Sequence, residues 1–181
     1  GLGDVYKRQQ DNIEIASFFG EFPTSLWNGG RFSNGDQCDR RFVEEVVKSI
    51  NTRGIPVRYT YTNPLLTEED LADAYCNFCM KTADNGKNEV LVVSPILEAY
   101  IRKNYPGFTI NSSTCKEIRG IEGVNEELKK DYGLVVLDYN LNNQFGELQK
   151  ITDKSRCELL VNACCIPECP RIGEHYRTIA K

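Results

Sequence analysis

The sequence predicts an α/β fold built on a parallel sheet, and two observations support this prediction. Short runs of β-branched and aromatic residues alternate with amphipathic stretches, roughly 20–40 residues apart, which is the pattern of successive βαβ units. Of the 181 residues, 40% are hydrophobic and 27% are charged, as in ordinary globular domains. A chain of this length can therefore enclose a hydrophobic core between a sheet and its helices.

Two architectures fit this alternation. One is an incomplete (β/α)8 barrel of the TIM type with about six βα units, and the alternative is an open doubly wound parallel sheet. We favour the barrel, because a complete one needs about 250 residues and this chain stops directly after an expected helix. We expect residues 10–181 to be one α/β domain truncated at its C-terminus, preceded at residues 1–9 by a non-native leader or cloning scar.

The expected strands are short segments bounded by Gly, Pro and Asn. Residues 89–94 form a continuous apolar run, typical of a strand that is buried on both faces, whereas residues 56–62 alternate in polarity up to an Asn-Pro break. In order, the expected strands span residues 13–19, 56–62, 89–94, 107–113, 134–138 and 157–162.

The expected helices follow from apolar residues at helical spacing and from residue types that begin or end helices. Gly54 ends the first helix, Thr67 and Asp70 resemble a capping box that opens the second, and Pro95 suits the first turn of the third. In order, the expected helices span about 42–50, 67–85, 95–105, 125–132 and 145–148, and a last one follows the cysteines near the end.

Polar residues gather where the expected strands end. Parallel α/β folds place their functional sites at the carboxyl ends of the strands, so these residues are expected on one rim of the sheet. The alternative is that strand ends are polar because they meet water and turns. The substrate-binding candidates at these ends are Asn63, Ser94, Ser113, Asp138, Asn140 and Asn162.

The segment Trp27-Asn-Gly-Gly-Arg31 follows the first expected strand and adds three candidates to the same rim. Trp27 could stack on a substrate, Asn28 lies beside it, and Arg31 could clamp an anion. The two glycines let the backbone turn sharply or approach a ligand closely. The alternative is a tight loop that packs its tryptophan over the mouth of the barrel.

Eight cysteines is a high number for this chain, which opens with no signal peptide. Reduced thiols or metal ligands are therefore expected rather than disulfides, in keeping with a cytoplasmic location. The C-x3-C spacing of Cys165 and Cys169 lets two sulfurs converge on one metal. The remaining candidate ligands are Cys115, Cys157 and Cys164, with Cys38 and His175 behind them. The alternative is that these cysteines are small buried hydrophobes or free thiols.

Two further features limit the function. The net charge is −4, without a concentrated basic face, so nucleic acid is not indicated as a partner. No apolar run approaches the length of a membrane-spanning helix, and a single histidine excludes an HExxH metal motif. Cys76 and Cys79 form a CxxC pair within an expected helix, where we predict a structural role rather than a redox role.

The segment CELLVNACCIPECPRIGEHY, residues 157–176, resembles the cysteine-bearing segment of the collagenase-like peptidase family. That family includes iron–sulfur proteins that act in the hydroxylation of tRNA, ribosomal RNA and ubiquinone. The matching residues are Val161, Asn162, Cys165, Cys169 and Pro170. The resemblance implies a (β/α) barrel in which Cys165 and Cys169 are cluster ligands. The family's Glu-Phe…His-Gly…Cys signature is absent from this chain.

The leading functional hypothesis is an iron–sulfur enzyme of this family that carries out hydroxylation or other redox chemistry on a small-molecule or macromolecular substrate. The first alternative is a metal-free or zinc-stabilised binding module without catalysis, and the second is a peptidase. An open barrel would leave its first and sixth strands as unpaired edges, so self-association through these edges is also expected.

Overall fold

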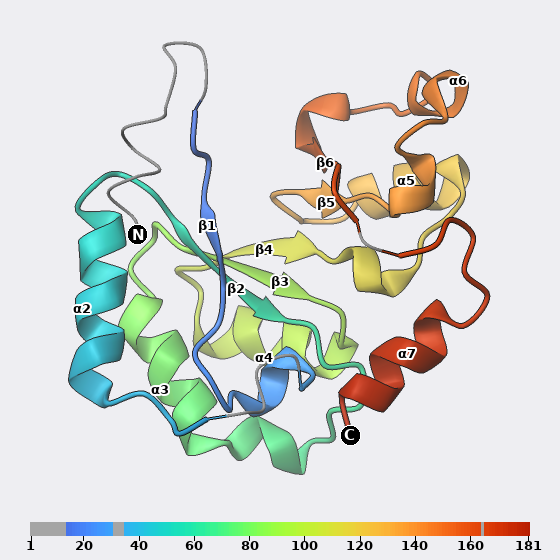
Figure 1. The fold of residues 1–181 in the computed structure, drawn as a ribbon. Helices are drawn as coiled ribbons and strands as arrows, with labels where there is room; N and C mark the ends of the chain where they lie inside the picture. The colour runs from blue at the N-terminus through green and yellow to red at the C-terminus, as the bar shows by residue number, and fades with distance from the viewer. Residues whose placement is uncertain (1–13, 31–34, 164) are drawn as a thin grey trace.

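The computed structural model describes residues 14–30, 35–163 and 165–181. Within them, six parallel strands form one curled sheet with helices packed against it (Figure 1). Each strand pairs with the next one along the chain, so the spatial order repeats the sequence order. The strands are β1 Phe18–Gly20, β2 Val57–Tyr61, β3 Glu89–Val92, β4 Thr109–Ser112, β5 Val135–Val136 and β6 Cys157–Glu158.

The strand order separates the two architectures that the sequence allowed. A doubly wound sheet reverses its strand order at a switch point, and the described sheet runs from β1 to β6 without a reversal. The sheet is therefore singly wound, and its curl is that of a half-barrel. β1 and β6 are its edges, as expected, while self-association through them stays a prediction.

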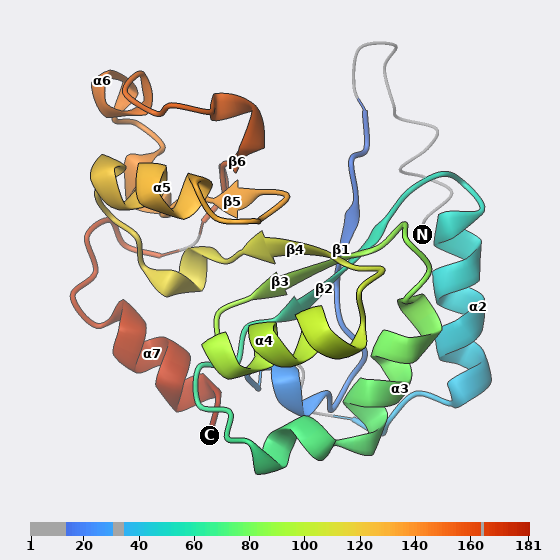
Figure 2. The same cartoon turned by 180° about the vertical axis from the view of Figure 1, so that it is seen from behind.

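Helices α2 to α5 lie along one face of the sheet, and α7 lies beside the carboxyl ends of β2 to β4 in both views (Figures 1 and 2). No helix among the described residues is long and apolar enough to cross a membrane. The helices are α2 Arg40–Asn51, α3 Ala74–Ala83, α4 Pro95–Asn104, α5 Ile121–Leu128, α6 Phe145–Leu148 and α7 Ile172–Ile179. Short 3-10 turns are η1 Leu26–Asn28, η2 Glu69–Ala72, η3 Thr114–Lys116, η4 Tyr139–Leu141 and η5 Lys154–Arg156.

The hydrophobic core lies between the convex face of the sheet and these helices. Alternate residues of β2 belong to it, because side chains of a strand point to opposite faces in turn. Tyr59 and Tyr61 form one buried cluster with Val43 of α2, Met80 of α3 and Leu97 of α4. A second cluster packs α5 against β5 and the loop beyond it, and it contains Ile121, Val124, Leu128, Val135, Leu137, Leu141 and Ile151.

The elements differ from the sequence predictions mainly at their boundaries. β5 and β6 are each two residues long, because only these residues meet their neighbours in register. The helix expected at 125–132 is α5, which begins at Ile121. Asn125 therefore lies inside the helix, where its side chain accepts hydrogen bonds from Thr152.

The helix expected from Thr67 begins later, at Ala74. The capping-box contact exists, since Thr67 N donates to Asp70 Oδ2 at 2.7 Å, but it closes only the short turn η2. The side chain of Asp73 then caps α3 by accepting a hydrogen bond from Cys76 N at 2.7 Å.

A buried ion cluster occupies the concave side of the sheet. Arg58 of β2 is 2% exposed. Its Nε donates to Glu89 Oε2 of β3 and its Nη1 donates to Glu158 Oε2 of β6, both at 2.6 Å. Asn111 of β4 donates to Glu89 Oε2 at 2.8 Å. Burial alone would lower the pKa of Arg58, but the hydrogen bonds and charges of Glu158 and Glu89 raise it. The cluster therefore joins four strands across the curl.

Replacing the cluster's single cation should unfold the sheet readily. In Arg58→Met, two carboxylates lose their partner, and breaking a buried pair in this way costs about 3–5 kcal/mol. We expect urea denaturation followed by far-UV circular dichroism to report a loss of that size. Arg53→Met, an exposed change after α2, is the control and should stay within about 0.5 kcal/mol of the parent. Equal stability of the two variants would contradict a structural role for the cluster.

Candidate functional site

The loops after the strands' carboxyl ends form the region that we call the rim, comprising residues 21–30, 62–64, 93–94, 113–117, 137–142, 159–163 and 165–169. Parallel strands place all their carboxyl ends at one edge of a sheet. These loops consequently surround a single edge, beside α7 (Figure 1). The sequence placed its substrate-binding candidates at this edge, and the described ones lie there.

Several of these candidates use their polar atoms to hold the next helical turn. Ser94 Oγ accepts a hydrogen bond from Leu97 N at the start of α4, at 3.5 Å. Ser113 Oγ accepts one from Cys115 N at the start of η3, at 3.1 Å. Asp138 Oδ1 accepts one from Asn140 N at the start of η4, at 2.9 Å. These three side chains are N-caps, whose ordinary role is to satisfy free backbone N–H groups.

The structure overturns the predicted substrate contact of Trp27. Its side chain is 0% exposed, its Nε1 donates to Asp70 O at 2.8 Å, and its ring meets the rings of Tyr61 and Tyr100 edge-on. Trp27 therefore belongs to the core between the sheet and the helices, and not to the mouth of the barrel, where the alternative interpretation placed it. Asn63 Nδ2 donates to Leu26 O at 2.9 Å and ties this loop to β2. Arg31 lies outside the described residues.

The cysteine loop, residues 165–169, is docked on η4. Tyr139 Oη donates to Ile166 O at 3.2 Å, and Asn140 Oδ1 accepts from Glu168 N at 2.6 Å. Asn140 Nδ2 in turn donates to Asp138 Oδ1 at 2.7 Å. Asp138 and Asn140 thus position the cysteine loop. Asn162 precedes it as an exposed residue.

The structure does not gather the predicted metal ligands in one place. Cys165 and Cys169 are half-buried on the docked loop, and Cys115 lines a cavity on the concave side. Cys157 packs against the core of α5, where its Sγ donates to Asp153 O at 3.5 Å. Among the described residues, no group of three or more His, Cys, Asp or Glu side chains could hold a metal ion. Cys164 lies outside the described residues.

The CxxC pair is structural, as predicted. Cys76 and Cys79 are both 0% exposed. Cys76 lies in the first turn of α3, not mid-helix, and a helix N-terminus would normally lower a thiol pKa. Burial dominates here and raises the pKa of both thiols, that of Cys79 to about 12. Neither thiol is suited to redox chemistry.

A cavity of about 90 Å³ opens on the concave side of the sheet, below the rim. Thr60, Thr62 and Cys115 give it polar groups, and Leu91 and Val136 give it apolar walls. Arg58 and Glu158 close its floor. Mixed polar and apolar lining at the carboxyl ends of parallel strands is typical of ligand sites.

Four buried side-chain atoms among the described residues have no hydrogen-bond partner: Thr24 Oγ1, Asn28 Nδ2, Thr114 Oγ1 and Asn142 Oδ1. All four belong to the rim, in the loops after β1, β4 and β5. Native proteins rarely leave a buried polar atom unpaired, because each one costs about 1–3 kcal/mol. Sequence analysis found only Asn28. The run Asn111 to Thr114 was a visible signal for Thr114, but no pattern distinguishes an unpaired hydroxyl from a cap.

Comparisons with known proteins bear on the fold alone. No family model matches the sequence, and no curated protein matches it. Among solved structures, the U32 peptidase Mk0906 matches with a TM-score of 0.58 and 14% sequence identity, and the alignment covers 94% of this chain and 70% of that chain. The two proteins therefore share an α/β fold.

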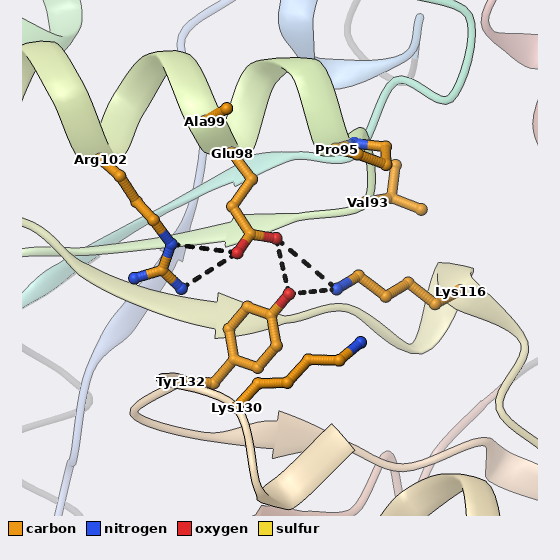
Figure 3. A pocket seen from close by; sticks show the side chains of 8 residues that line it. All are labelled: Val93, Pro95, Glu98, Ala99, Arg102, Lys116, Lys130 and Tyr132. Atoms are coloured by element: carbon orange, nitrogen blue, oxygen red, sulfur yellow. Dashed lines mark hydrogen bonds and ion pairs between the residues drawn. The ribbon is translucent and has the colours of Figure 1, made fainter. Parts of the chain in front are cut away.

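A second polar cluster lies on the helix side of the sheet, around a cavity of about 480 Å³ (Figure 3). Tyr132 Oη donates to Glu98 Oε2 of α4 at 2.6 Å and accepts from Lys116 Nζ at 2.8 Å. Lys116 Nζ also donates to Glu127 Oε1 of α5 at 2.8 Å. These groups satisfy one another, so we interpret the cluster as a structural link between α4 and α5 rather than a ligand site.

Glu127 should make the free energy of unfolding depend on pH in the acid range. Burial alone would raise its pKa, but hydrogen bonds from Lys116, Lys130 and Ser112 lower it from 4.5 to about 2. A carboxylate whose pKa is lower in the folded than in the unfolded state contributes its full stabilisation at pH values above the unfolded-state pKa. This contribution disappears as the pH falls from about 4.5 to 2.

We expect Glu127→Gln to reduce the free energy of unfolding at pH 7 by about 2–3 kcal/mol and to flatten its decline between pH 4.5 and 2. Urea titrations at a series of pH values measure both effects. The matched control is Glu126→Gln, because Glu126 is exposed and pairs only with the equally exposed Lys129 among the contacts of the described chain. A parallel pH profile for parent and Glu127→Gln would show that this carboxylate is not the titrating group.

Proposed function

We propose that the chain is an incomplete TIM-type barrel, distantly related to the U32 peptidases, that binds peptides at its rim. The singly wound parallel sheet and the shared fold with the U32 peptidase Mk0906 support the barrel. The resemblance of residues 157–176 to the collagenase-like peptidase family points in the same direction. The observation that carries the binding site is the set of four unpartnered buried atoms in the rim.

The chemistry of these atoms suits a peptide backbone. Asn28 Nδ2 can only donate a hydrogen bond and Asn142 Oδ1 can only accept one, while the hydroxyls of Thr24 and Thr114 can do either. An extended peptide offers N–H donors and C=O acceptors in alternation. A bound peptide would therefore pair with both the donors and the acceptors among these four atoms. Polar atoms on an exposed surface need no such partner, because water supplies one.

Removing one of these atoms should weaken binding without weakening the fold. Thr114→Val keeps the shape of the side chain and deletes an unpaired hydroxyl, so the free protein should be as stable as the parent or up to about 1 kcal/mol more stable. Peptide affinity should fall roughly fivefold to tenfold, the value of one hydrogen bond. Thr109→Val, at the opposite end of β4 and exposed, is the control.

The measurement is an NMR titration of the ¹⁵N-labelled protein with pooled short peptides, with mass spectrometry of the peptides before and after incubation. Shifts confined to rim residues support the proposal, and cleaved peptides would add hydrolysis to binding. Intact peptides with rim shifts indicate a binding module. Peptides that leave the rim signals unmoved would refute the proposal.

We further propose a metal-binding role for the cysteine loop, with an iron–sulfur cluster first and zinc as the alternative. Cys165 and Cys169 are held on a loop that Tyr139 and Asn140 anchor to η4. The described residues supply two sulfur ligands, whereas a cluster or a structural zinc site uses four. Two ligands are thus missing from the described part of the chain. Hydroxylation or redox chemistry would require further ligands to complete the metal site.

Anaerobic purification followed by iron, zinc and acid-labile sulfide analysis tests this role. We expect metal in the parent protein, and less than about a tenth as much in Cys165→Ser and Cys169→Ser, because sulfur is the preferred ligand atom. Cys157→Ser is the matched control, since its thiol lies against the core of α5. Metal-free parent protein, or equal loss in all three variants, would exclude the site.

A further inference from the structure

A cavity of about 410 Å³ separates the loop after β1 from the end of α7. Leu26, Ile179 and Ala180 give it apolar walls, and Thr24, Ser25, Asn28 and Lys181 give it polar groups. It lies in the rim but is distinct from the concave cavity, with which it shares no lining residue. A volume of this size lies within the range of small-ligand pockets, about 300–1,000 Å³.

Thr24 and Asn28 both line this cavity, and each carries a buried polar atom without a hydrogen-bond partner. Asn28 is 2% exposed, and its Oδ1 accepts a hydrogen bond from Gly30 N at 2.8 Å. Because that N–H requires an oxygen acceptor, the orientation of the amide is fixed and Nδ2 remains as a donor without a partner. Thr24 Oγ1 is buried without a partner as well. Two side chains in the wall of this cavity therefore each carry a buried polar atom without a hydrogen-bond partner.

The backbone around the cavity is held in an unusual conformation. Thr24 has a φ of 62°, which is unfavourable for a β-branched residue and is found mainly where the surrounding structure enforces it. Gly30 has a φ of 79°, and a Cβ at that position would come within 1.9 Å of Ile179 O. The Gly-Gly turn that the sequence singled out thus allows the loop to approach α7 and form the cavity wall.

We propose that this cavity is a carboxylate site that accepts a small aliphatic acid, such as the C-terminal residue of a peptide. Two unpaired donors match the two oxygens of a carboxylate, which accept hydrogen bonds and donate none. The apolar walls formed by Leu26 and Ile179 suit the aliphatic side chain of the same residue. The inference rests on the proposed function in taking the rim as the peptide-binding region, and it specifies where and by what chemistry one end of the peptide is held.

The probes are N-acetyl-leucine and its neutral analogue N-acetyl-leucinamide, titrated into the ¹⁵N-labelled full chain. We expect the acid to shift the amide signals of Thr24, Asn28 and Gly30, and to bind at least tenfold more tightly than the amide, because the amide replaces one acceptor oxygen by a donor. Equal affinity of the two probes would overturn the carboxylate assignment.

Two variants test the donors. Thr24→Gly deletes the hydroxyl and suits a positive φ, so the protein should fold and bind the acid roughly tenfold more weakly. Asn28→Asp keeps the acceptor for Gly30 N and replaces the donor by a negative charge, so binding of the acid should be lost. The control is Asn104→Asp, at an exposed amide of α4 that lies outside the rim and does not line this cavity. Unchanged affinity in both Thr24→Gly and Asn28→Asp would refute the site.

The result also separates this inference from the proposed function. If peptides move signals around Thr114 and Asn142 but N-acetyl-leucine leaves Thr24 and Asn28 unmoved, the carboxylate site is wrong and peptide binding at the rim stands. If neither probe moves any rim signal, both are wrong.

Discussion

The ion cluster of Arg58, Glu89 and Glu158 sets the curvature on which the rest of the structure depends. β2 and β6 are separated by three intervening strands, so in a flat sheet they would lie about 19 Å apart, at about 4.8 Å for each strand spacing. Arg58 Nη1 nevertheless lies 2.6 Å from Glu158 Oε2. Only a curled sheet brings these side chains together. The apolar residues that alternate with Arg58 then face outward to the helices, and the polar ones face inward.

Curvature also gathers the loops of the rim. Loops that would be spread along the edge of a flat sheet are drawn around a common centre, with α7 beside them. Most of their polar atoms serve as caps or anchors, as Ser94, Ser113 and Asp138 do. Four polar atoms of the described rim are buried without a hydrogen-bond partner. Each such atom lowers the stability of the fold, and well-packed proteins contain few of them. The rim thus combines a frame held by the caps with a few buried polar atoms, on which the proposed peptide site rests.

The sequence predicted the parallel α/β class and the order of the β-strands and α-helices, because apolar periodicity and glycine stops depend on local residues. It misplaced the starts of α3 and α5. Asp73 caps α3 through a local contact that is no more distinctive in sequence than the Thr67–Asp70 pair. Asn125 lies inside α5, and its side chain is held by the distant Thr152. The loops that carry the described candidates do lie at one edge of the sheet. Trp27 is buried in the core instead, because a tryptophan ring is as suited to a core as to a substrate. Arg58 was missed as a central residue, since its partners lie 31 and 100 positions away in the chain.

Those two separations have a consequence for the way the chain acquires its structure. Every strand pairs with its immediate successor, so each βα unit can add to the preceding ones as the polypeptide is synthesised, without waiting for distant segments. Arg58 can meet Glu89 early, whereas Glu158 arrives only with β6. The longer contact is non-local, and such contacts form late because chain closure must precede them. The Arg58–Glu89 contact needs only β2 and β3, whereas the Arg58–Glu158 contact can form only once β6 has joined the sheet.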